Sequence, residues 1–283
     1  SVRLRNLVQD DVIFVSESGL ETPEDIQVLR DNNIGVALMG ETFMRSPNKV
    51  EKLAYLYGPT YYTPKVKMCG ISKVETIPAV VEAKPDYMGL VFAPSKRQVT
   101  VDQAKILVEE LHRGYAKKYG SDTEYDKNDT IKTVGVFVNE TVDNLVTIAN
   151  EANLDAVQLH GDEDETFIQS LKERTNVEVW KAVQIRTAAD AEKWIDSSAD
   201  MLLFDAYHKD ERGGTGEVFD WSSLDAFERP FMLAGGIDST NVARAIRTVR
   251  PYGIDISSGI ETNGVKDDEK ITAFTKIVKS IGR

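Results

Sequence analysis

Short apolar runs alternate with segments of helical period along the chain from residue 65 onward. Eight such runs occur, and they are apolar on both faces rather than on alternate residues, which is typical of parallel strands that helices cover on the outside. They read KVKMCG, YMGLVFA, TVGVFV, DAVQLHG, EVWKAVQI, MLLFDA, FMLAGG and GIDISSG. Helices are predicted between them, for example over residues 101–118, 141–152, 188–197, 239–249 and 267–280.

Eight successive strand-then-helix units predict an α/β fold in which residues 65–283 close into a (β/α)₈ TIM barrel. The competing fold is an open, doubly wound sheet. No GxGxxG motif follows the first run, so the open-sheet, nucleotide-binding interpretation lacks its best support.

The first 58 residues form a separate pattern of two strand-helix units. The run VIFVSESG precedes a helix start with Thr22 as N-cap and Pro23 at the first helical position, and a second strand, GVALMGE, precedes a helix over residues 48–57. Two such units cannot close a barrel, so we expect an N-terminal partial barrel fragment. Residues 59–64 are predicted to be a linker, and the polar stretch 117–130 a surface insertion.

Composition excludes several classes of protein. The single cysteine rules out an intramolecular disulfide and a multi-thiolate zinc site, and the three histidines form no HExxH pair, so no metal and no cofactor are expected. A formal net charge of −12 argues against a nucleic-acid partner. No run reaches the roughly 20 apolar residues that span a bilayer, and no signal peptide is evident, so a cytoplasmic protein without a membrane partner is expected.

The working groups of such barrels lie at the carboxyl ends of the strands. Cys69 ends the first run and Asp205 lies near the end of the sixth. Cys69 is either a buried structural thiol or, once ionised, a base, and Asp205 is either the partner of a neighbouring charge or, if partly desolvated, a general acid. One group that takes a proton and one that gives a proton suffice for isomerisation next to a carbonyl or imine.

Other residues on the same predicted face suggest an anionic ligand. Glycine-rich segments follow the sixth, seventh and eighth runs, where backbone N–H groups commonly bind phosphate; they contain Gly214, Thr215, Gly235, Gly236, Ser258 and Gly259. Arg97 is either a solvated surface charge or a residue whose planar guanidinium group binds a carboxylate through paired hydrogen bonds. His160 is either a satisfied polar residue at a strand end or a ligand contact.

Taken together, the motifs of residues 65–283 resemble the phosphoribosylanthranilate isomerase family. The resemblance rests on KMCGIS, GLVFAPSKRQV, GVFVN, VQLHGDE, LLFDA, GGTGEVFDW, FMLAGGI and DISSGIETNGVKD, which occur in order and at suitable spacing. It implies a cofactor-independent Amadori rearrangement of N-(5-phosphoribosyl)anthranilate in tryptophan biosynthesis. Asp205 would protonate the ribose ring oxygen, Cys69 would remove the C2 proton, Arg97 would hold the anthranilate carboxylate, and the glycine-rich loops would hold the phosphate.

The front segment resembles the C-terminal end of indole-3-glycerol-phosphate synthase. VSESGLETPEDI and ALMGETFMRSP carry this resemblance, and Glu17, Ser18, Gly19 and Gly40 match the last two strand ends of that enzyme. The synthase draws its catalytic lysines and glutamates from earlier strands, so no synthase activity is expected of this chain. The order of the two segments implies a piece of a multifunctional, fungal tryptophan-biosynthesis protein, in which a glutamine amidotransferase domain is a further possibility.

Two alternative functions remain open from the sequence. The first is another phosphosugar isomerase or epimerase barrel, although those enzymes commonly use paired carboxylates or metal-bound histidines, which the predicted face lacks. The second is a catalytically idle scaffold or truncation product.

Overall fold

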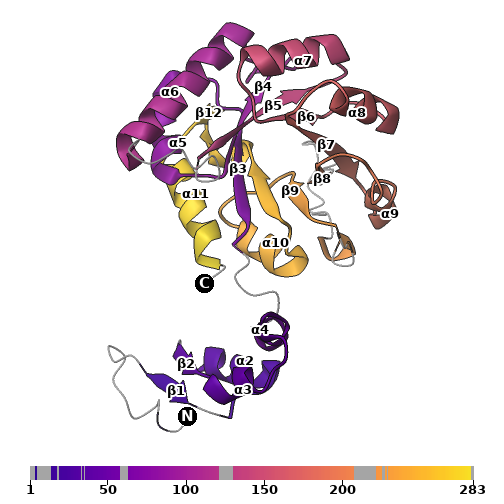
Figure 1. Cartoon of the computed structure of the whole chain (residues 1–283). Coiled ribbons are helices and arrows are strands. Elements are labelled where there is room, and N and C mark those ends of the chain that lie inside the picture. Colours follow the sequence, from indigo (N-terminus) through magenta and orange to yellow (C-terminus); the bar gives the residue numbers. More distant parts are fainter. Residues whose placement is uncertain are drawn as a thin grey trace, which may run out of the picture. The chain divides into compact units, whose positions relative to one another are not determined.

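The computed structural model describes residues 4, 14–17, 19–32, 34, 36–57, 63–120, 130–206, 221–224, 227 and 229–281. The chain divides into two compact units, one within residues 1–62 and one within residues 63–281 (Figure 1).

The second unit is a closed barrel of eight parallel strands, so the predicted TIM barrel is confirmed and the open sheet is wrong. Each strand pairs with its neighbours in sequence, and the last strand, β10, closes the barrel by pairing with the first, β3. The strands are β3 (Lys65–Cys69), β4 (Tyr87–Val91), β5 (Lys132–Phe137), β6 (Ala156–Leu159), β7 (Glu178–Ile185), β8 (Met201–Ala206), β9 (Phe231–Ala234) and β10 (Gly253–Ile256).

Helices surround this barrel on the outside (Figure 1). Thr100 and Thr141 begin two of them as N-caps whose side chains accept hydrogen bonds from the backbone, as their residue type favours. The α-helices are α5 (Ile77–Ala83), α6 (Val101–Tyr119), α7 (Val142–Glu151), α8 (Glu165–Lys172), α9 (Ala188–Glu192), α10 (Val242–Val249) and α11 (Asp268–Ile281). Shorter elements are the 3₁₀ helices η1 (Val74–Thr76), η2 (Trp221–Leu224) and η3 (Ser258–Ile260) and the hairpin β11 (Glu261–Thr262) and β12 (Val265–Lys266).

Large side chains fill the barrel interior. Tyr87, Trp180, Leu203 and Met232 belong to one buried cluster, in which the rings of Tyr87 and Trp180 meet edge to face with their centroids 4.9 Å apart. This cluster fills part of the barrel interior with packed side chains, so a ligand site is expected at the carboxyl ends of the strands rather than within the barrel.

Two boundary predictions were wrong. The helix predicted over 188–197 ends at Glu192. The following residues form tighter turns, such as Ile195 N–H to Glu192 O, and Arg229 donates to the carbonyl oxygens of Trp194, Ile195, Ser197 and Ala199. The insertion predicted from residue 117 begins later, because α6 continues to Tyr119 before Gly120 ends it. Residues 121–129 lie outside the described part of the chain.

The first unit contains the predicted strand and helix pairs. Its strands β1 (Val15–Glu17) and β2 (Val36–Leu38) pair in parallel, and its helices are α2 (Pro23–Asp31), α3 (Gly40–Met44) and α4 (Lys49–Tyr57). A small core of Leu20, Ile26, Leu29, Ile34 and Leu56 holds these elements together. Val15, Val36 and Leu38 of the two strands are exposed.

No described helix combines the length and the apolar character that crossing a bilayer requires.

Candidate active site

A cavity of about 380 Å³ opens at the carboxyl ends of the barrel strands. Seven of the ten predicted site residues line it, namely Cys69, Arg97, His160, Asp205, Gly235, Gly236 and Ser258. Gly259 lies beside it without lining it, and Gly214 and Thr215 lie outside the described residues. The barrel therefore brings together residues that are far apart in the sequence, as expected for groups at the carboxyl ends of its strands.

Cys69 ends β3 inside a buried cluster of charges. The side chain of Lys67, two residues earlier on the same face of the strand, is wholly buried, and its Nζ donates to Asp255 Oδ2 at 2.8 Å. Burial is the largest cause acting on the pKa of the Cys69 thiol, and it raises that pKa. The charge of Lys67 lowers the pKa, the charge of Asp255 raises it, and the charge of Lys266 lowers it. The net direction is upward. The Cys69 carbonyl accepts a hydrogen bond of 3.2 Å from Ser257 Oγ.

Asp205 meets His160 across the cavity wall between β6 and β8. His160 Nε2 lies 3.2 Å from Asp205 Oδ2, and His160 Nδ1 lies 3.0 Å from the amide nitrogen of the buried Gln158. Since an amide nitrogen only donates, Nδ1 accepts from Gln158, and the protonated Nε2 donates to Asp205. Asp205 and His160 are both half-buried, so the carboxyl group reaches the cavity while its orientation is fixed.

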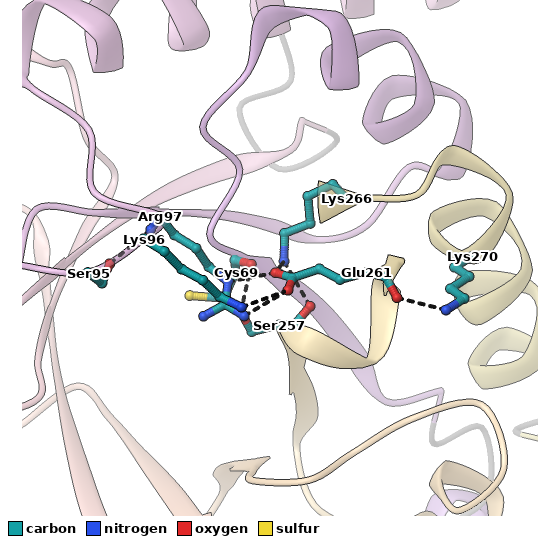
Figure 2. Close-up of polar contacts among 8 residues, drawn as sticks. All are labelled: Cys69, Ser95, Lys96, Arg97, Ser257, Glu261, Lys266 and Lys270. Atoms are coloured by element: carbon teal, nitrogen blue, oxygen red, sulfur yellow. Dashed lines mark hydrogen bonds and ion pairs between the residues drawn. The ribbon is translucent and has the colours of Figure 1, made fainter. Parts of the chain in front are cut away.

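Arg97 is fixed by an acidic residue that the sequence analysis did not single out (Figure 2). Its Nε donates to Glu261 Oε1 at 2.6 Å and its Nη2 to Glu261 Oε2 at 2.9 Å, which leaves Nη1 for another acceptor. Lys266 Nζ donates to the same carboxylate at 3.0 Å. Burial alone would raise the pKa of Glu261, but the hydrogen bonds from Arg97 and Lys266 lower it to about 2, so the group stays ionised.

The path of the Arg97 side chain requires a glycine at position 70. Gly70 has a φ of +79°, and a Cβ atom there would lie 2.4 Å from Arg97 Cδ. The glycine directly after Cys69 therefore allows the arginine to cross the end of β3 and reach Glu261.

The loops after β9 and β10 are those from which phosphate binding is predicted. Gly235 and Gly236 have φ values of +87° and +61°, which favour glycine. A Cβ atom on Gly259 would lie 2.3 Å from the carbonyl oxygen of Ile237, so the two loops touch only because residue 259 is a glycine. Backbone N–H groups in such turns, with the short helix η3, are suited to a phosphate dianion.

A buried ion pair holds the loop that carries His160. Glu163 accepts from the N–H groups of Asn139 and Gly161 at 2.7 and 2.9 Å, and from Lys181 Nζ at 2.9 Å. Lys181 also donates to the carbonyl oxygen of Gly161 at 2.7 Å. This ion pair was not predicted from the sequence, although Lys181 is a charged residue between the apolar Trp180 and Ala182 of β7.

Among the described residues, no group of three or more histidine, cysteine, aspartate or glutamate side chains could hold a metal ion.

Comparison with known proteins supplies the biochemical context. A family model described as N-(5'-phosphoribosyl)anthranilate (PRA) isomerase matches residues 66–277. An N-(5'-phosphoribosyl)anthranilate isomerase of Thermoanaerobacter sp. is 45% identical over 219 residues, which are 77% of this chain and 98% of that protein. A multifunctional tryptophan biosynthesis protein of Phycomyces blakesleeanus is 34% identical over an alignment that covers 99% of this chain and 42% of that protein.

A solved structure shares the barrel together with a ligand. It is a phosphoribosyl anthranilate isomerase in complex with reduced 1-(o-carboxyphenylamino)-1-deoxyribulose 5-phosphate, which is 31% identical to this chain, with a TM-score of 0.62. The match covers 77% of this chain and 99% of that one.

Proposed function

The chain belongs to the N-(5'-phosphoribosyl)anthranilate isomerase family and is an isomerase of tryptophan biosynthesis, and from this premise we propose that Asp205 and Cys69 are its general acid and base. The observation that carries the proposal is that both side chains line one cavity that also has an arginine and glycine-rich loops at its edges. Such a cavity suits a ligand with a carboxylate and a phosphate. Membership of this family also disfavours the two alternatives, another phosphosugar isomerase and an idle scaffold.

The proposed reaction begins at Asp205. Its carboxyl group gives a proton to the ribose ring oxygen, the bond from that oxygen to C1 breaks, and the lone pair of the anilino nitrogen forms a protonated imine (iminium ion) to C1. The hydrogen bond from His160 Nε2 holds one oxygen of Asp205 and leaves the other oxygen to give the proton. A carboxyl oriented in this way suits general acid catalysis.

Cys69 completes the rearrangement in the proposal. Its thiolate takes the proton from C2, the electrons form a C1–C2 double bond, and the imine nitrogen becomes an amine. The resulting enolamine then tautomerises to the ketone of 1-(2-carboxyphenylamino)-1-deoxyribulose 5-phosphate. β3 and β8 are separated by β9 and β10 in the barrel, so base and acid approach the ligand from different sides.

We assign the carboxylate of the substrate to Arg97 and the phosphate to the backbone of Gly235, Gly236, Ser258 and Gly259, with Gly214 and Thr215 as further candidates outside the described residues. The Nη1 edge of the guanidinium is the group that Glu261 leaves for a ligand. In this proposal the main role of His160 is its hydrogen bond to Asp205, and its contact with the ligand is additional.

Replacing Arg97 by alanine tests the carboxylate site. We expect the KM to rise about 10- to 100-fold with little change in kcat, because a charge-assisted hydrogen bond to the bound substrate is lost. Steady-state fluorescence of phosphoribosylanthranilate measures both constants. Lys96→Ala is the matched control, since Lys96 is 61% exposed.

Binding of two product analogues gives a second readout for Arg97. Wild type should bind the reduced product analogue more tightly than the same compound without its carboxylate, and Arg97→Ala should bind the two alike. If Arg97→Ala still prefers the carboxylated analogue by the wild-type ratio, the assignment of Arg97 is wrong.

For residues 1–58 we propose a separate origin as the C-terminal part of an indole-3-glycerol-phosphate synthase barrel, with residues 59–64 as a linker to the isomerase at 65–283. The alignment with the multifunctional Phycomyces protein, which covers 99% of this chain, supports a fused and fungal parent protein. Exposed apolar residues on β1 and β2 are those that further strands and helices of a barrel would cover.

The purified chain is expected to form no indole-3-glycerol phosphate, because the proposed fragment lacks the early strands that carry catalytic groups in that enzyme. A variant restricted to residues 63–283 should keep its isomerase kcat/KM within about twofold, because every described residue that lines the cavity belongs to the retained unit. Product analysis by chromatography and the fluorescence assay check both statements. Detectable synthase product, or an inactive but folded shortened variant, would contradict them.

A further inference from the structure

We propose that Lys67, held by Asp255, is a positioning residue that keeps the Cys69 thiol able to ionise inside the barrel. The inference rests on the proposed role of Cys69 as the base. It adds a residue whose side chain acts through Cys69 rather than on the substrate itself.

The strand registers place these groups together. Lys67 pairs with Asp255 between β3 and β10, and Cys69 pairs with Gly89 between β3 and β4. Lys67 and Cys69 are two residues apart, so their side chains point into the barrel on the same side. A Cβ atom on Gly89 would lie 3.0 Å from Cys69 Sγ and 3.2 Å from Lys67 Nζ, so both groups pack against this one glycine.

The burial of Lys67 needs a chemical reason. Its side chain is wholly buried in the interior of a barrel, where apolar branched side chains are usual. An ammonium group has three donors, and Asp255 Oδ2 accepts one of them at 2.8 Å. Burial lowers the pKa of Lys67, but the charge of Asp255 and the Cys69 side chain raise it, and the net direction is upward. A thiolate is a much better acceptor for this ammonium than a neutral thiol.

The balance of buried charge around Cys69 favours the thiolate. Lys67, Lys266 and Arg97 supply three positive charges, and Asp255 and Glu261 supply two negative ones; each of these side chains is at most 22% exposed. The cluster is therefore positive while Cys69 carries its proton and neutral once the thiol ionises. Asp205 and His160 face the same cavity from the opposite wall, and Lys96 is exposed to solvent.

The charges around Cys69 act on the pKa of its thiol in the directions that their positions imply. Burial is the main cause that raises the pKa of Cys69, and the strongest opposing cause is the charge of Lys67. Without the ammonium, the charges of Lys266 and Arg97 would remain to oppose burial and the charge of Asp255. The thiol would then ionise only at a more alkaline pH.

The single cysteine of the chain makes the inference directly measurable. The pH dependence of the rate at which iodoacetamide alkylates this thiol reports Cys69. In Lys67→Met we expect the pKa of the thiol to rise by about one unit or more and the alkylation rate near neutral pH to fall about tenfold or more. The kcat/KM near neutral pH should fall by a similar factor and partly recover as the pH rises.

Three further variants separate a positioning role from a merely structural one. Lys181→Met also breaks a buried ion pair, with Glu163, but away from Cys69, so the thiol pKa should stay at the wild-type value. Lys67→Arg keeps the charge and should restore part of the alkylation rate. The double variant Lys67→Met/Asp255→Asn replaces both charges of the pair, so neither is left buried and unpaired, and it is used if Lys67→Met does not fold. Its thiol pKa should still lie above that of wild type, by a smaller margin than in Lys67→Met.

A thiol pKa in folded Lys67→Met or in the double variant equal to that of wild type would overturn the inference. The role of Cys69 is tested separately. An active Cys69→Ala would show that Cys69 is not the base, whatever the thiol pKa values of the Lys67 variants. If Cys69→Ala is inactive but the Lys67 variants keep the wild-type thiol pKa, only the role of Lys67 is rejected.

Discussion

Cys69→Ser is expected to lower kcat/KM by about 10²- to 10⁴-fold, the usual contribution of a group that transfers a proton in the transition state. The hydroxyl group is close to the thiol in size, so packing against Gly89 and the hydrogen bond from Ser257 to the backbone of residue 69 are retained. A serine hydroxyl does not ionise near neutral pH, even beside Lys67. The loss should therefore fall on kcat rather than on KM.

Two measurements accompany the Cys69→Ser assay. Circular dichroism should match wild type, and the reduced product analogue should bind with nearly unchanged affinity, because the variant keeps Arg97 and the glycine-rich loops. Cys69→Ala should be at least as inactive as Cys69→Ser. A kcat in Cys69→Ser within a few-fold of wild type would remove Cys69 from the mechanism, since general base catalysis contributes far more than that.

Asp205→Asn is expected to produce a loss of the same order, about 10²- to 10⁴-fold in kcat/KM. Asparagine has the same shape and still accepts a hydrogen bond from His160 Nε2 through its amide oxygen, so the loop geometry is kept. It carries no acidic proton to give to the ribose ring oxygen. Ring opening should become rate-limiting, while binding of the product analogue, which is already open, should be retained.

His160→Asn is the informative companion of Asp205→Asn. It removes the bond that orients Asp205 but leaves the carboxyl group in place, so a smaller loss than in Asp205→Asn is expected, because the acid itself remains. If His160→Asn were more damaging than Asp205→Asn in folded protein, the histidine rather than the aspartate would be the better candidate for the acid.

Much of the fold was predictable from local patterns. The eight runs from KVKMCG to GIDISSG became strands β3 to β10 because apolar residues on both faces suit a strand that helices cover. Boundaries were less predictable. The residues after Glu192 continue as tighter turns because Arg229, from a distant segment, donates to their carbonyl oxygens.

The candidate site was predictable only in part. Cys69 and Asp205 were found because each is a polar group at the end of an apolar strand. Glu261, Lys266 and Asp255 were missed as site residues. Asp255 and Lys67 carried a usable signal, since each is a charged residue between two apolar residues of a predicted strand, but neither run shows which opposite charge it meets.

The sequence by itself determined the number and order of the strands, the helices between them and the chemical groups at the strand ends, because these follow from spacing over a few residues. Only the tertiary structure decided which groups meet. Lys67 reaches Asp255 across 188 positions of the chain, and Arg97 reaches Glu261 across 164. Both pairs depend on the register in which the last strand closes against the first, and closure of a barrel is a property of all eight strands together.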